Sequence, residues 1–169
     1  AGIVRQLGDG AVAREVLFDG TIRSQRSIVG GVVAFLNGAV EGAVVRGSLG
    51  NAAPNRVGGI AAVVVTSAAR ITDVVVDADL TGSERVGGIV GQVEGASRLV
   101  LARAVVVVDV TTAVRDAEAV CGFGPQNVTA TTTFFATDGT LTLVAATGPQ
   151  TSTVSGTVGQ TTAQLQDAD

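Results

Sequence analysis

Residues Val57–Ile60 read VGGI, and the same four letters return at Val86–Ile89. VGGV at Val29–Val32 is the same element, VCGF at Val120–Phe123 is interpreted as a drifted copy, and residues 1–4 as a copy lacking its first residue. The second glycines of these copies are Gly2, Gly31, Gly59, Gly88 and Gly122, separated by 29, 28, 29 and 34 positions. Paired glycines let neighbouring backbones approach closely or turn a corner, so the motif predicts a repeated bend.

A second pattern lies nearly twenty residues into each unit, and it alternates between apolar or small residues and polar ones. Its copies are Phe18–Ile22 (FDGTI), Val45–Leu49 (VRGSL), Val76–Leu80 (VDADL), Val106–Val110 (VVVDV) and Thr137–Leu141 (TDGTL). Their closing aliphatic residues are separated by 27, 31, 30 and 31 positions. A period of two is expected of a strand with one buried face.

Two patterns that repeat in phase, with a period near 29 residues, predict an all-β fold. The period is too short for a propeller blade and the sequence too rich in valine and threonine for a helical repeat. We predict a β-solenoid (parallel β-helix) of about five coils over residues 1–145, with coils stacked about 4.8 Å apart. The expected inward columns are Ile22, Leu49, Leu80, Val110 and Leu141, and the smaller Gly20, Gly47, Ala78, Val108 and Gly139. Residues 146–169 are predicted to cap the last coil or to begin a following segment.

The composition excludes several classes of function. The 169 residues carry a net charge of −4, no histidine and one cysteine. Without histidine there is no Ser-His-Asp or Cys-His nucleophile, and one cysteine excludes an internal disulfide or a zinc–cysteine site. An acidic chain with 3% aromatic residues lacks the basic and stacking surfaces of a nucleic-acid binder. No apolar run reaches the roughly 18 residues of a membrane helix, so we predict no membrane insertion.

The string VGGIVGQ at Val86–Gln92 resembles the GLUG repeat, and Gly42–Gly50 and Asp73–Thr81 resemble the second half of that repeat. GLUG repeats occur in tandem in large secreted and surface proteins, including bacterial adhesins and immunoglobulin-A-cleaving metallopeptidases, as β-helical, non-catalytic parts. The resemblance covers about residues 1–145, and it implies a secreted or cell-surface location. It brings no catalytic residue, and the usual Asn-Ser-Tyr portion of the repeat is absent.

Three acidic residues form the candidate site. Asp79 and Asp109 occupy the same position in neighbouring coils, and Asp77 lies on the same face as Asp79. Stacked carboxylates repel each other, and three interpretations stay open. The aspartates are solvated and relieved by Arg85 or Arg115, or they bind Ca²⁺ through carboxylate and carbonyl oxygens, or they form the acid–base pair of a polysaccharide-cleaving β-helix. The absence of Trp and Tyr, which commonly face sugar rings, weighs against the last interpretation.

Other polar positions receive simpler interpretations. Asp19, Arg46 and Asp77 alternate in sign at one position of the repeat and predict a surface ion-pair ladder. Thr129–Thr133 is interpreted as ordinary strand threonine, with an ice-binding face as the alternative. Cys121 stands where the repeat has a glycine, and we predict a buried, inert thiol.

These observations predict a non-enzymatic structural or presentation module of a larger extracellular or cell-surface protein, acting as a stalk, adhesin or filament component. No cofactor is expected, and Asp77, Asp79 and Asp109 are the one candidate calcium site. The alternatives are a carbohydrate-active β-helix that uses the same carboxylates, or a module that binds glycan, calcium or ice. Expected partners are other copies through the coil ends, a larger parent assembly, or a glycan. Ala1 is interpreted as the cut end of a larger or processed protein.

Overall fold

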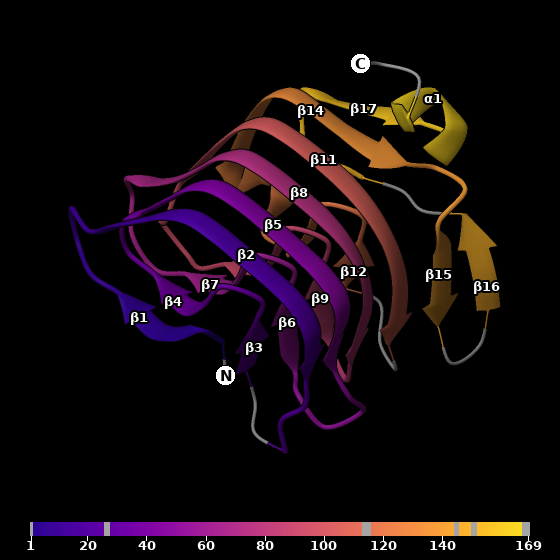
Figure 1. Cartoon of the computed structure of the whole chain (residues 1–169), viewed down its shortest axis with the longest axis horizontal. Coiled ribbons are helices and arrows are strands. Elements are labelled where there is room, and N and C mark those ends of the chain that lie inside the picture. Colours follow the sequence, from indigo (N-terminus) through magenta and orange to yellow (C-terminus); the bar gives the residue numbers. More distant parts are fainter. Residues whose placement is uncertain (1, 26–27, 113–115, 144–145, 150–151, 167–169) are drawn as a thin grey trace.

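The structure is a computed structural model that describes residues 2–25, 28–112, 116–143, 146–149 and 152–166, with the backbone alone for 141–143 and 146–149. The chain winds as a β-solenoid of about four turns around one apolar core (Figure 1). Each turn contributes strands to three separate sheets, and neighbouring turns pair in parallel. The predicted fold class is therefore confirmed.

The three sheets differ in length and position. One sheet contains β1 (Val4–Leu7), β4 (Val33–Leu36), β7 (Ala61–Val64), β10 (Val90–Val93) and β13 (Cys121–Phe123). A second, of very short strands, contains β3 (Ile28–Gly30), β6 (Arg56–Gly58), β9 (Arg85–Gly87) and β12 (Ala117–Glu118). The third, which we call the long sheet, is built on β2 (Val12–Ile22), β5 (Ala39–Gly50), β8 (Ala69–Gly82) and β11 (Leu99–Thr112).

The last winding departs from the repeat. After a 3₁₀ turn at Pro125–Asn127, β14 (Val128–Ala136) pairs with the first half of β11, and β15 (Thr140–Leu143) pairs with its last residues. β16 (Ala146–Pro149) is antiparallel to β15, whereas β17 (Thr157–Gln160) adds to β14 in parallel. Figure 1 shows β17 and the short helix α1 (Thr162–Gln166) at the C-terminal end of the stack. Because this winding splits, the stack has about four regular turns, where five were predicted. The domain boundary after residue 145 stays a prediction.

The aliphatic column of the prediction is present. The backbone register joins Ile22 to Leu49, Leu49 to Leu80, Leu80 to Val110 and Val110 to Leu141. The side chains of Leu49, Leu80 and Val110 are at most 1% exposed. The small column runs as predicted from Gly20 to Val108, whereas Gly139 precedes β15 and takes no part in the ladder.

The fifth copy of the glycine motif was predicted at the wrong residues. β12 aligns Ala117 with Val86 and Glu118 with Gly87, so residues 117–120 (AEAV) are the true counterpart of VGGI. Cys121 instead aligns with Val90 in an aliphatic column and is 0% exposed. The thiol is buried, as predicted, but for a different reason, and desolvation raises its pKa to about 12.

The long sheet bends along a column that the sequence did not reveal. One residue in each winding of this sheet adopts a left-handed backbone conformation, with φ between +49° and +66°. The column consists of Glu15, Gly42, Asp73, Arg103 and Thr132. In β8 the inward positions on either side of the bend are three residues apart, at Ile71 and Val74, because the left-handed residue shifts the alternation. The long sheet therefore turns a corner without breaking its ladder.

Thr132→Gly is expected to raise the free energy of unfolding by about 1 kcal/mol, because a β-branched residue at φ +49° is strained and glycine is not. Urea denaturation measures the change. Thr131→Gly is the matched control: Thr131 is also exposed but lacks the left-handed conformation, so the same substitution should lower stability. Equal losses in both variants would contradict a strained corner at Thr132.

Candidate functional site

The outer face of the long sheet is hollowed where β14 leaves β11. The pairing of β14 with β11 ends at Phe135, and the chain returns to β11 only at β15. β17 pairs with the other edge of β14, over Thr133–Ala136. The resulting groove has a volume of about 440 Å³. Its polar lining consists of Arg46, Asp77, Asp79, Asp109, Asp138 and Thr162. An adjoining hollow of about 240 Å³ shares part of this lining and reaches Val75, Val105 and Leu165.

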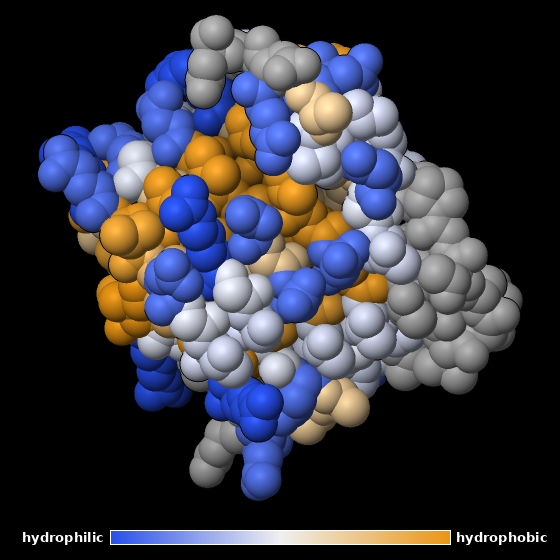
Figure 2. Space-filling model, turned by 45° about the vertical axis from the view of Figure 1, so that its right-hand side comes forward, coloured by the Kyte–Doolittle hydropathy of each residue, from blue (hydrophilic) through white to orange (hydrophobic). Residues whose placement is uncertain are grey.

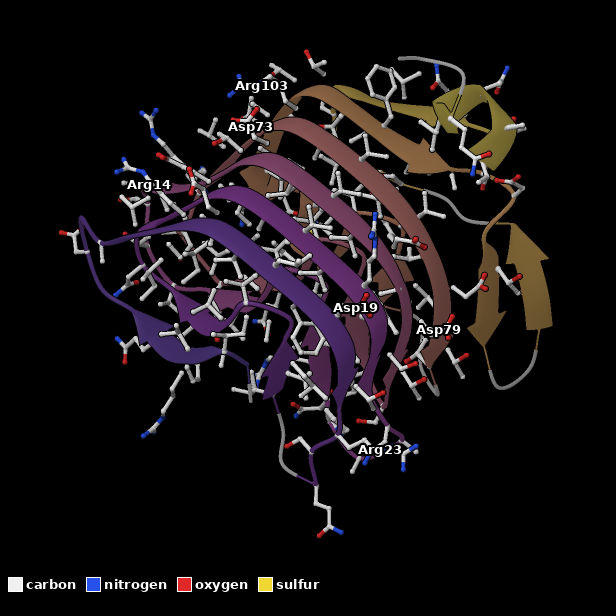
Figure 3. All side chains as sticks on the ribbon, in the orientation of Figure 1. Arg14, Asp19, Arg23, Asp73, Asp79 and Arg103 are labelled. Carbon is white, nitrogen blue, oxygen red and sulfur yellow. The ribbon has the colours of Figure 1, made fainter. Side chains whose placement is uncertain are left out.

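Strand alternation places the aspartates on this face. In β8 the side chains of Val76, Ala78 and Leu80 are buried, so those of Asp77 and Asp79 point outward. Figure 3 shows Asp79 on the outer side of the long sheet, away from the bend where Asp73 and Arg103 lie together. Figure 2 shows that apolar and hydrophilic side chains share this side of the molecule.

The ladder register brings the predicted residues together. Asp79 and Asp109 are direct neighbours in the pairing of β8 with β11, as the sequence predicted. Asp77 lies beside Arg46 on one side and Val107 on the other. All three predicted aspartates line the groove.

The sequence did not single out Asp138 as a site residue, although it stands at the position of Asp77 in the last copy of the repeat. One carboxylate oxygen of Asp138 accepts hydrogen bonds from the backbone N–H of Thr162 at 2.8 Å and from its hydroxyl at 2.9 Å. These bonds hold the pKa of Asp138 below its usual range. Asp109 accepts a bond from the backbone N–H of Thr140 at 2.5 Å. Two of the four carboxylates therefore tie the last winding and α1 to the groove.

Of the two predicted charge partners, the structure describes only Arg85, which lies beside another aspartate. Arg85 lies near Asp116, with 3.9 Å between Nε and Oδ2, and Arg115 lies outside the described residues. Asp19, Arg46 and Asp77 are register neighbours, as expected. Among the described residues, however, the ion pairs are Arg14–Glu41, Arg85–Asp116 and Arg103–Asp73, so no ladder of ion pairs forms in that column.

The Arg103–Asp73 pair instead joins neighbouring strands at the bend of the long sheet. Nε and Nη2 of Arg103 donate to the two carboxylate oxygens of Asp73 at 2.5 and 2.6 Å. This bidentate bond lowers the pKa of Asp73 and raises that of Arg103. Because both side chains are about half exposed, solvent screens the pair, and we assign it a role in fixing the register of the bend.

The calcium interpretation of Asp77, Asp79 and Asp109 stays a prediction. Within the described ranges, no three acidic or cysteine side chains are arranged closely enough to hold a metal ion. Binding would therefore require the carboxylates to move together. Thermal unfolding in millimolar Ca²⁺ tests this, and an unchanged unfolding temperature would count against the calcium site.

Replacing Asp138 by asparagine is expected to remove a pH-dependent contribution to stability. Because folding lowers the pKa of Asp138, its contribution is complete above the unfolded value of about 3.9 and disappears as the pH falls through the folded value. The wild type should thus be more stable than Asp138→Asn at pH 6, and the difference should shrink at pH 3. Urea denaturation at both values measures it. Asp19→Asn is the control, at an exposed aspartate with no hydrogen bond or ion pair in the described part of the chain. At pH 6 it should lower stability less than Asp138→Asn does.

The fold is that of a β-solenoid, and the site is an aspartate-lined groove on its outer face. No protein-family model matches the sequence, and no curated protein matches it either. The architecture is similar to the crystal structure of a "putative immunoglobulin A1 protease" from Bacteroides ovatus, with a TM-score of 0.63 and 16% identity. The likeness covers 96% of this chain but only 66% of the other. At this identity it shows the fold, and the GLUG assignment itself is not confirmed.

This comparison corrects the prediction that the chain is not an enzyme. That prediction rested on the absence of histidine and of recognisable catalytic motifs. The same fold occurs in a chain that carries a protease name, so the fold does not exclude an enzyme. Among the described residues, no helix is long and apolar enough to cross a membrane.

Proposed function

We propose that this chain is a β-helical module that spaces and presents neighbouring parts of a larger extracellular or cell-surface protein, as a stalk, adhesin or filament component. The main support is the continuous register of the column from Ile22 to Leu141. A stack in which each winding contacts only its neighbours forms a stiff rod, and its length follows from the number of windings. Such a rod suits a spacer.

Removal of one winding tests this function. Ala61 aligns with Val90, so deleting residues 61–89 joins Ile60 to Val90 in register. We expect a folded protein that is about 4.8 Å shorter by small-angle X-ray scattering. Deleting residues 61–85 is the control, because it joins Ile60 to Val86 out of register and should prevent folding. If both deletions unfold the chain, the windings are not interchangeable spacer units.

The location is tested in the parent protein. On intact cells that produce it, an added protease should cleave this segment if it lies at the surface. Protection from the protease on intact cells, with cleavage after lysis, would contradict the surface location.

The N-terminal end of the stack supports self-association. In the described residues β2 is the last strand of the long sheet at this end, and its outer edge is unpaired. Val16 and Phe18 are partly exposed there, whereas their register neighbours Ala43 and Val45 are 0% exposed. Unpaired edges over an apolar core favour pairing with a second copy. Light scattering over a range of concentrations tests this, and a persistent monomer would contradict it.

A second candidate is a carbohydrate-active β-helix. The observation that favours it is the gathering of Asp77, Asp79 and Asp109 in one groove. Carboxylates on either side of a sugar are the usual catalytic pair of glycoside hydrolases. A polysaccharide panel with Asp79→Asn and Asp109→Asn tests it. Activity that neither substitution lowers would remove these residues from the mechanism, and binding without cleavage would indicate a glycan-binding groove.

A further inference from the structure

Two arginines lie side by side at the start of the short strands, in a different sheet from the one whose aspartates line the groove. Arg56 begins β6 and Arg85 begins β9, and the two are direct register neighbours. Since the next residues, Val57 and Val86, are fully buried, both arginine side chains point away from the core. The ladder therefore holds two guanidinium groups on one side, with backbones about 4.8 Å apart.

Both guanidinium groups are held in place by one glutamine. Nε of Arg56 donates to Oε1 of Gln92 at 2.5 Å, and Nη1 of Arg85 donates to the same oxygen at 2.9 Å. Gln92 is only 7% exposed, and Arg85 also lies over the ring of Phe123, at 4.4 Å from its centroid. The two cations are thus fixed in orientation before any ligand arrives, which reduces the entropy lost on binding.

The charges of this arginine pair are not balanced. The shared acceptor, Gln92, is neutral, and the only carboxylate in an ion pair with either arginine in the described part of the chain is Asp116. Its Oδ2 is 3.9 Å from Nε of Arg85, which is too long for a hydrogen bond. That Nε is buried and has no hydrogen-bond partner. Two positive charges therefore face one distant negative charge.

The fold itself does not require arginine at this position. In the preceding winding the register neighbour of Arg56 is Ile28, so the same ladder forms with an aliphatic residue. Two stacked arginines repel each other, and Nε of Arg85 has no acceptor. A purely structural role does not explain why arginine stands at both positions.

We propose that Arg56 and Arg85 form a binding site for an oxyanion, namely a carboxylate or a sulfate group. The planar guanidinium groups match the geometry of such anions, and the N–H groups that remain accessible, unlike the buried Nε of Arg85, would donate charge-assisted hydrogen bonds to the anion. The site is on the short-strand side of the solenoid and shares no residue with the aspartate groove. It stands independently of the proposed spacer function.

Sulfate binding to the full chain tests the proposal. Isothermal calorimetry and thermal unfolding are measured with sodium sulfate against sodium chloride at equal ionic strength. We expect saturable heat and a saturable rise in unfolding temperature for the wild type. Arg56→Ile, which copies the residue at Ile28, should weaken sulfate binding about tenfold or more, and Arg85→Gln should do the same. A parallel titration with sodium acetate separates a carboxylate preference from a sulfate preference.

Arg103→Gln is the matched control, because Arg103 already has its own carboxylate in Asp73, and this variant should bind sulfate like the wild type. Sulfate also stabilises proteins generally, but that effect rises without saturation and equally in all variants. The proposal would be overturned if sulfate gave this general rise and nothing more, or if neither anion gave saturable heat. If Arg85→Gln does not fold, Arg56→Ile decides: undiminished sulfate binding in that variant also overturns it.

Discussion

Replacing Gly59 by alanine is expected to lower the free energy of unfolding by about 3 kcal/mol. The added Cβ would overlap the carbonyl oxygen of Gly88 in the next winding and would lie 2.6 Å from Cγ1 of Val76. The first neighbour is backbone that already accepts the hydrogen bond of the Gly59 N–H, and the second is a fully buried core side chain. Neither can move away without opening the stack.

Gly8→Ala is the matched control for this prediction. A Cβ at Gly8 meets nothing within 4 Å, and its backbone is not in the left-handed region. We expect its stability to stay within about 0.5 kcal/mol of the wild type, as for most surface substitutions. Chemical denaturation measures both variants. Similar losses in the two would show that the close approach at Gly59 does not determine the stability of the corner.

The same close approach explains why the motif disappears in the last copy. A Cβ at Gly31 would meet the backbone of Gly59, one at Gly59 that of Gly88, and one at Gly88 that of Ala119. At Ala119 the short-strand sheet ends with β12, and in the described residues no further strand of that sheet follows. A methyl group is therefore tolerated there. A search for paired glycines fails at this winding, because glycine is required only where the backbone of a following winding lies close.

The register of the long sheet could be predicted because burial enforces it. Each inward aliphatic residue must lie over another, so alternation and spacing together placed Leu49 beside Leu80 correctly. The bend at Asp73 and Arg103 could not be predicted in this way. Its left-handed residues are of different types, and only one of the five is glycine, so no residue pattern marks the column.

The groove was predictable in part for a related reason. The outward face of a strand follows from its alternation, so Asp77, Asp79 and Asp109 could be placed together. Its far wall could not, because Thr162 reaches Asp138 only through the return of β17 to β14. That return depends on tertiary pairing after the repeat has ended, where neither the glycine motif nor the alternating pattern continues.

Leu80→Ala is expected to lower the free energy of unfolding by about 3 kcal/mol, within the range for a fully buried leucine. Leu80 is 0% exposed and lies in the aliphatic column between Leu49 and Val110. The ladder fixes the spacing of these neighbours, so they cannot close the cavity. Denaturant unfolding measures the loss.

The loss in the free energy of unfolding should depend on where in the stack the truncated side chain lies. Ile22→Ala removes the end of the same column, where the side chain is only partly buried, so we expect a smaller loss than at Leu80. Leu17→Ala, on the outer face with a 70% exposed side chain, should change stability by less than about 0.5 kcal/mol. Because windings contact only their neighbours, a central cavity weakens two interfaces and a terminal one weakens a single interface. Equal losses at Leu80 and Ile22 would contradict a column that runs through the stack.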